Sequence, residues 1–233
     1  MNVDWERNVF APAAKLNYRR VHSNRQRKIR CVSVGCVPSR PSARVYLDLE
    51  THGFLHENYI PPIKELSLVI IYDNDHGETT EPPQVVSLGK DVSTCFKCLA
   101  FHDSVATALE RCALPPHHGS VQIIAHNGSA FDFLILYCWF RYHQMSSAWY
   151  RKCLLVDSYI VAQKSKRFTS LKLDNVSLYR HVTGKQLASG FRAHRARDDA
   201  LCLARWFESA KLPLRVVRMS DILCCAKKRA KII

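Results

Sequence analysis

The chain has 233 residues, of which 47% are hydrophobic and 23% charged, so it can form one well-packed domain of ordinary globular composition. No apolar run approaches the ~20 residues of a membrane-spanning helix, and residues 1–13 contain no apolar signal segment. The net charge of +14 favours a polyanionic partner, with nucleic acid first and an anionic membrane surface second.

The two ends of the chain are predicted to be basic arms. Residues 1–44 carry ten Lys or Arg against two acids and lack sustained hydrophobic periodicity. This arm is either a solvated tail or a segment with a nucleic-acid or targeting role. We therefore predict a flexible arm over residues 1–42, a domain over 43–212 and a basic tail over 213–233. The tail contains "KKRAK", which resembles a nuclear signal, and we expect an intracellular protein of the nucleus or cytoplasm.

Strands dominate the first part of the predicted domain. The apolar segments "ARVYLDL" (43–49) and "ELSLVIIYD" (65–73) predict buried strands, and "QVVSL" (84–88) predicts a short third strand after a turn-rich loop. The segment "HDSVATALERCAL" (102–114) has apolar residues at helical spacing, with Asp103 as the expected cap.

Helices and strands alternate in the rest of the domain. Two more strands are predicted, over 120–126 and 152–158, and the first is stopped by Asn127 and Gly128. Helices are predicted over 131–144, 170–182 and 194–210, with a short helix after the fifth strand. Three strands followed by alternating helices and strands indicate an α/β fold, with a mixed five-stranded sheet flanked by helices.

Two acids, Asp48 and Glu50, lie two residues apart at the end of the first predicted strand. Residues at this spacing point to the same face of a strand. Like charges so close together are unfavourable unless a cation lies between them, and a divalent metal ion is the obvious candidate.

Three further residues have contexts that suit the same chemistry. Asp132 begins an apolar helix, where a simple capping-region acid is the alternative interpretation, as it is for Asp157 at the end of the fifth strand. Asp199 shares a helix face with Leu203 and Trp206, so we expect it to be buried and in need of a partner. His194 lies at the start of the same helix, a position where histidine is more often structural than catalytic.

Taken together, these segments resemble the DEDDh (DnaQ-like) 3′→5′ exonucleases. The matching segments are "YLDLETHGF", "IIAHNGSAFDFLIL" with "VDSYIVAQK", and "HRARDDALCLARW", which follows the family's H-x-A-x-x-D-A pattern. The resemblance covers residues 44–210 and is greatest to the three-prime repair exonuclease branch. It implies a ribonuclease H-like fold and a two-metal phosphodiester hydrolase, with two Mg²⁺ for which Mn²⁺ can substitute.

The resemblance also assigns roles to residues. It implies that Asp48, Glu50, Asp132 and Asp199 hold the metals and that His194 is the general base. It places a lip after Glu50 that grips the terminal nucleotide, in which Phe54 or Leu55 stacks on the last base. The implied substrate-binding residues are Leu49, Thr51, His52, Gly53, Phe54, Leu55, His126 and Asn127.

The expected partner is a nucleic acid with a free 3′-hydroxyl end, and the resemblance favours DNA over RNA. An exoribonuclease of the RNase T or oligoribonuclease kind is the first alternative, and a catalytically silent nucleic-acid-binding domain is the second. A zinc module built on Cys95 and Cys98 is a third, although a second C-x2-C pair is missing. Members of the branch often form dimers through an edge strand, for which residues 84–88 are the candidate here.

Overall fold

The computed structural model describes residues 43–55, 59–73, 81–89, 93–111, 121–146, 149–168, 171, 191–212 and 215–230. The predicted N-terminal arm and most of the predicted helix at 170–182 lie outside these residues. Within the described part, no helix is both long enough and apolar enough to cross a membrane.

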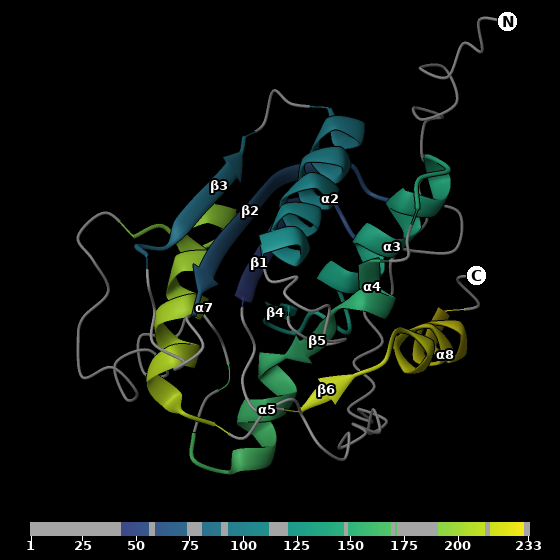
Figure 1. Ribbon diagram of the computed structural model, residues 1–233. Coiled ribbons are helices and arrows are strands. Elements are labelled where there is room, and N and C mark those ends of the chain that lie inside the picture. Colours follow the sequence, from purple (N-terminus) through teal and green to yellow (C-terminus); the bar gives the residue numbers. More distant parts are fainter. Residues whose placement is uncertain are drawn as a thin grey trace, which may run out of the picture.

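One mixed sheet forms the centre of the fold, with the strand order β3-β2-β1-β4-β5-β6 (Figure 1). The neighbours β1, β4 and β5 run parallel, whereas β2, β3 and β6 each pair antiparallel with their neighbours. The strands are β1 (Ala43–Thr51), β2 (Ile63–Tyr72), β3 (Gln84–Leu88), β4 (Val121–Ala125), β5 (Leu154–Asp157) and β6 (Val216–Val217). The predicted α/β architecture is confirmed, but the prediction of five strands was wrong because it missed β6.

Helices cover both faces of the sheet. On one face, α2 packs on β2, and α3 packs on β1 and α2. An edge-to-face aromatic pair joins the two helices, with 6.0 Å between the ring centroids of Phe101 and Phe140. The helices on this face are α2 (Thr94–Arg111), α3 (Asp132–Tyr142), α4 (Trp149–Lys152) and α8 (Met219–Ala230).

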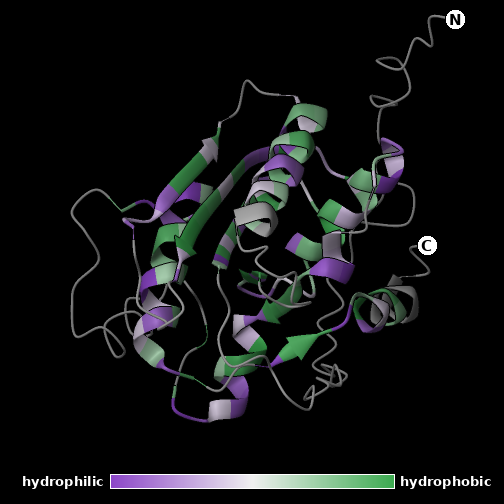
Figure 2. Ribbon diagram, in the orientation of Figure 1, coloured by the Kyte–Doolittle hydropathy of each residue, from purple (hydrophilic) through white to green (hydrophobic). Residues whose placement is uncertain are grey.

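The opposite face is covered by α7 (Ala196–Ala210), with α5 (Ser158–Ser165) beside it. Figure 1 shows the sheet between α2 and α7. Leu203 and Trp206 of α7 are fully buried against Tyr46 and Val69 of the strands. Figure 2 shows the strands mainly in the colour of hydrophobic residues, whereas α7 alternates between both colours, as expected for a helix with one buried face.

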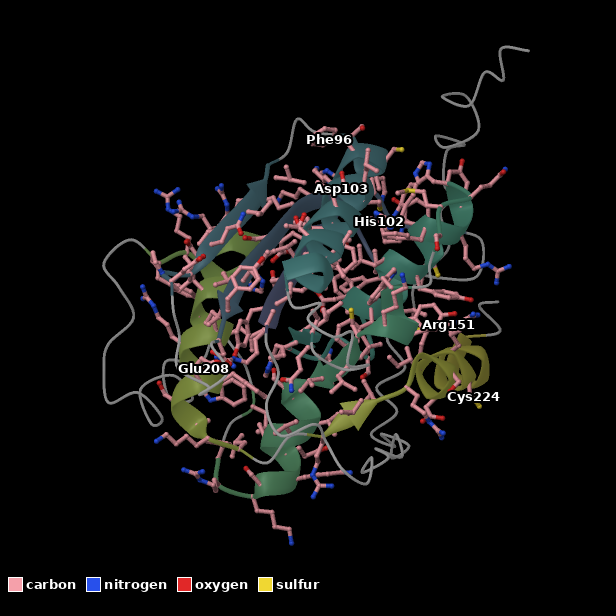
Figure 3. The ribbon with its side chains drawn as sticks, viewed as in Figure 1. Phe96, His102, Asp103, Arg151, Glu208 and Cys224 are labelled. Carbon is pink, nitrogen blue, oxygen red and sulfur yellow. The ribbon has the colours of Figure 1, made fainter. Side chains whose placement is uncertain are left out.

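Two helix boundaries differ from the prediction. The helix α2 begins at Thr94 rather than His102, so Asp103 lies within the helix and does not cap it (Figure 3). The reason is that Cys98 and Phe101 extend the buried face toward the N-terminus. The last helix begins at Ala196, so His194 lies just before it.

The structure also extends past residue 212, where the domain was expected to end. Strand β6 pairs with β5, and Met219 and Ile222 of α8 are buried in the core. Residues 216–222 are therefore part of the packed domain rather than a tail. The strand β3 lies at the edge of the sheet. Dimer formation through this strand stays a prediction.

Candidate active site

The face of β1 and β2 that packs on α7 changes from apolar to acidic along the strands. The pairs across the two strands begin with Tyr46 opposite Val69, both buried. Next along β1 is Asp48 opposite Ser67, and then Glu50 opposite Glu65. The prediction that Asp48 and Glu50 point to the same face is confirmed, because both lie on the face of β1 that carries Tyr46 and is covered by α7.

Asp132 reaches the same end of the central strands from α3. Since β1 and β4 are parallel, the helix that follows β4 begins next to the end of β1. Asp132 is 3% exposed, and its Oδ1 accepts a hydrogen bond from the backbone N–H of Leu49 at 3.1 Å. This contact places Asp132 directly against the strand that carries the acidic pair.

The turn before α3 is held by Asp157 and needs a glycine at residue 128. Oδ1 of Asp157 accepts from the N–H of Asn127, and Oδ2 accepts from Ser129, at 3.1 and 3.0 Å. A Cβ at Gly128 would lie 2.6 Å from the Cβ of Ala125, which is too close for any other residue. The capping interpretation of Asp157 is confirmed, because it also accepts from the first N–H groups of α5.

Asp199 and His194 come from the start of α7. Asp199 is 6% exposed, as predicted, and its Oδ2 accepts from the backbone N–H of His194 at 2.8 Å. The His194 backbone is left-handed, with φ of 63°, and its side chain is 81% exposed. Its ring Nδ1 lies 3.9 Å from Oε1 of Glu50, so the imidazole stands at the outer side of the acids.

The acids raise one another's pKa values. Burial raises the pKa of Asp48 well above its usual range, and the charges of Asp132 and Asp199 add to the effect. Burial also raises the pKa of Asp132 to about 8, although hydrogen bonds from backbone N–H groups oppose the rise. The pKa of Glu50 is also raised, because its partial burial outweighs the opposing charges of His194 and Lys64. These carboxylates form one electrostatic unit that favours bound cations or protons.

The donor set fits divalent metal ions. Oδ2 of Asp48 is buried and has no hydrogen-bond partner among the described residues. Glu50, His194 and Asp199 offer ligand atoms that lie within 4.8 Å of one another. Carboxylate oxygens are the ligands that Mg²⁺ and Mn²⁺ prefer, and a buried, unpaired carboxylate oxygen is costly without such a partner.

The lip after Glu50 stays a prediction, and the residues assigned to it differ in exposure. Phe54 is 78% exposed, whereas Leu55 packs partly against the core. Thr51 Oγ1 donates to the carbonyl of Gly53, whose φ of 119° requires glycine. The carbonyl of His52 accepts from the hydroxyl of Tyr59 at 3.2 Å. Of these residues, Phe54 is the one whose apolar surface is open to a ligand.

His126 is held within the protein. Its Nδ1 lies 2.9 Å from the hydroxyl oxygen of Ser158, and its Nε2 lies 2.6 Å from the carbonyl oxygen of Leu171. Its ring also packs edge-on against Trp206. The neighbouring Asn127 is exposed, with a left-handed backbone. Substrate binding by these two residues stays a prediction, and the structural contacts of His126 are already established.

One acid at the site was missed in the sequence analysis. Glu65 begins the buried face of β2, lies opposite Glu50, and is 5% exposed. The signal was its period-two spacing with Val69 and Ile71, because it predicts that all three residues face the same way. Glu65 was overlooked because it lies at the end of the predicted strand, where a charged residue is usually solvated.

The zinc alternative receives no support from the described residues. Cys95 and Cys98 lie in the first turns of α2, where Cys95 is exposed and Cys98 is buried. Burial raises the pKa of the Cys98 thiol to about 12, which disfavours the thiolate that zinc needs. The cluster of potential ligands found in the described part of the chain is the one at Glu50, His194 and Asp199.

No protein-family model matches the sequence, and no curated protein matches it either. Among solved structures, the chain is similar to E. coli ExoI in a zinc-bound complex with single-stranded DNA, with a TM-score of 0.50 and 14% identity. That match covers 74% of this chain and 41% of ExoI, so this chain spans less than half of the length of ExoI.

Two further solved structures are similar. The nuclease domain of 3′hExo, a DEDDh family member bound to rAMP, has a TM-score of 0.46 and 12% identity, and the match covers 76% of this chain and 97% of that domain. Cell-death related nuclease 4 has a TM-score of 0.46 and 13% identity, over 76% of this chain and 67% of that protein.

At these identities the similarity shows the fold alone. The chain therefore has a ribonuclease H-like fold, with an acidic cluster at the ends of its central strands. Membership of the three-prime repair branch stays a prediction.

Proposed function

We propose that this chain is a metal-dependent 3′→5′ exonuclease that degrades DNA from single-stranded or frayed 3′ ends to nucleoside 5′-monophosphates. The observation that carries the proposal is the convergence of four acids from β1, α3 and α7 at one end of the central strands. The raised pKa values of Asp48, Glu50 and Asp132 and the buried Oδ2 of Asp48 support a role in binding cations.

In the proposed mechanism, Asp48, Glu50, Asp132 and Asp199 hold two Mg²⁺ or Mn²⁺ ions. When bound, such ions supply charge that stabilises the attacking and leaving oxygens of a phosphodiester. His194 accepts the proton of the attacking water, and its exposure beside Glu50 leaves the ring accessible to that water. Phe54 stacks on the terminal base, a contact that tolerates any sequence.

The test is hydrolysis of a 3′-labelled oligonucleotide with Mg²⁺ or Mn²⁺. We expect release of nucleoside 5′-monophosphates, which Asp199→Ala abolishes. Asp198→Ala is the matched control, because Asp198 is adjacent on α7 but accepts from the N–H of Arg192, outside the acidic cluster. Failure to hydrolyse with any divalent metal would leave the chain as a nucleic-acid-binding domain without activity.

The choice of DNA rests on the resemblance of the segment "AHNGSAFDF" to the repair branch. A side-by-side degradation of matched single-stranded DNA, duplex DNA with a mismatched 3′ end, and RNA decides it. We expect the DNA substrates to be degraded faster. Faster turnover of RNA would make the chain an exoribonuclease, and it would leave the roles of the acids unchanged.

A further inference from the structure

The buried acid Glu65 connects the sheet to the segment that carries His194. Its Oε2 accepts a hydrogen bond from the backbone N–H of Ala196 at 3.3 Å and lies 3.3 Å from Nε of Arg195. Because a buried carboxylate is costly without partners, these two contacts account for the position of its side chain. Glu65 is thus tied to the residues that directly follow His194.

The start of α7 lacks a capping residue of its own. Arg195 occupies the N-cap position, where serine, threonine, aspartate or asparagine is usual, and it makes no side-chain cap. The first N–H groups of a helix need acceptors and favour a negative charge nearby. Glu65 supplies both to α7 from β2, 131 residues earlier in the chain.

This cap lies next to a strained residue. A left-handed backbone costs a non-glycine residue about 1–2 kcal/mol, so the φ of 63° at His194 must be imposed by its surroundings. On one side, the N–H of His194 is bound by Asp199. On the other side, Arg195 and Ala196 are bound by Glu65. The two acids therefore hold both ends of the turn that carries the imidazole.

Glu65 is itself fixed by a bulge and a buried lysine. The register pairs Glu50 with Glu65 but Thr51 with Ile63, so Lys64 is an extra residue on β2. The Nζ of Lys97 in α2 donates to the carbonyls of Ile63 and Lys64, at 2.9 and 2.7 Å. Lys97 is fully buried, and it thereby anchors the backbone immediately before Glu65.

We propose that Glu65 is a positioning residue that caps α7 from the neighbouring strand and so holds His194 in its left-handed turn at the metal-binding acids. The proposal rests on the proposed exonuclease function for its kinetic consequence, but not for its structural one. Glu65 acts through His194 and is not one of the four acids that we propose as metal ligands, although its charge also raises the pKa values of Asp48 and Glu50.

The structural consequence is tested first, by hydrogen–deuterium exchange of the full chain without metal or substrate. We expect Glu65→Ala to increase the exchange of the backbone amides at 194–199 at least tenfold, and Glu65→Gln to have a smaller effect because the amide oxygen still accepts from Ala196. The control is Glu208→Ala, which removes the contacts of α7 with Arg44 and Tyr46 at the other end of the helix (Figure 3). Unchanged exchange at 194–199 in Glu65→Ala, or an equal increase in Glu208→Ala, would overturn the proposal.

The kinetic consequence is tested with a double-mutant cycle. We expect Glu65→Ala to lower kcat about 10- to 100-fold with little change in KM, as for other supporting residues that orient a catalytic group. In a His194→Ala background, Glu65→Ala should change kcat by less than about twofold, because the residue it positions is gone. Independent, multiplying effects would show that Glu65 does not act through His194.

The two tests separate the two proposals. An inactive wild-type protein refutes the exonuclease function, whereas the exchange measurement still decides whether Glu65 caps α7. An active wild-type protein whose Glu65→Ala variant keeps full kcat refutes the positioning role alone. The conservative Glu65→Gln variant covers the case in which Glu65→Ala does not fold.

Discussion

Replacing Asp132 with asparagine should stabilise the metal-free protein at neutral pH. The asparagine side chain has nearly the same shape, and its Oδ1 can still accept from the N–H of Leu49. It removes a carboxyl group whose pKa is raised from 3.8 to about 8 by burial and neighbouring acids. The variant thus separates the electrostatic cost of the acid from its structural contact.

The magnitude follows from proton linkage. Between pH 4 and pH 8, Asp132 is protonated in the folded protein but ionised in the unfolded chain. The folded state then binds one more proton, so the free energy of unfolding falls as the pH rises, by at most about 1.4 kcal/mol per pH unit. The stability that protonated Asp132 contributes is fully present below the pKa of this carboxyl in the unfolded chain. It is lost as the pH rises through the pKa of the carboxyl in the folded protein.

The assay is urea denaturation at pH 5, 6 and 7 in the presence of a chelator. The difference in stability between Asp132→Asn and the wild type should grow in favour of the variant with each step of pH. Asp103→Asn, an exposed acid in α2, is the control and should track the wild type. Mg²⁺ at pH 7 should stabilise the wild type more than the variant. Parallel curves for Asp132→Asn and the wild type would refute the reasoning.

Three further predictions concern single side chains. His194→Ala should lower kcat about 10²- to 10⁴-fold. His194→Gly should be equally inactive, but it should be more stable than His194→Ala in urea because glycine relieves the left-handed strain. Equal stabilities of the two variants would contradict this. Phe54→Ala should leave the thermal midpoint unchanged but weaken single-stranded DNA binding by about 1–3 kcal/mol in a fluorescence titration, whereas Phe96→Ala on α2 should not; equal losses would rule out stacking by Phe54. Asp157→Asn should lower the free energy of unfolding by about 1–3 kcal/mol, because an NH2 donor replaces one carboxylate oxygen and then faces a backbone N–H group. An unchanged urea midpoint would contradict this.

Sequence spacing predicted the positions of the acids better than it predicted the contacts that hold them. Asp48 and Glu50 could be identified because period-two spacing places two acids on one face, and Asp199 because it shares a helix face with Leu203 and Trp206. These are local relations, which sequence spacing determines. The contact that brings Asp132 to β1 joins residues 83 positions apart, and the resemblance to known exonucleases was needed to expect it.

The errors have physical causes of a different kind. The helix α2 begins earlier than predicted because burial of Cys98 and Phe101, rather than a capping residue, determines its start. The two-residue strand β6 is too short to produce a periodic pattern. Glu65 was missed because it lies at the end of the predicted strand, and its contacts with Arg195 and Ala196 at the start of α7 are too distant in sequence to predict.

The position of α7 near the end of the domain means that both the fold and the acidic cluster depend on late segments of the chain. A polypeptide that stops before residue 196 lacks Asp199, and it also lacks the apolar cover for Tyr46 and Val69 on the sheet. A premature stop or a frameshift upstream therefore leaves this apolar face of the sheet uncovered, and we expect the fragment to aggregate. The acidic cluster of such a chain is completed only late in synthesis, because Asp199 and the apolar cover of the sheet lie on the same helix.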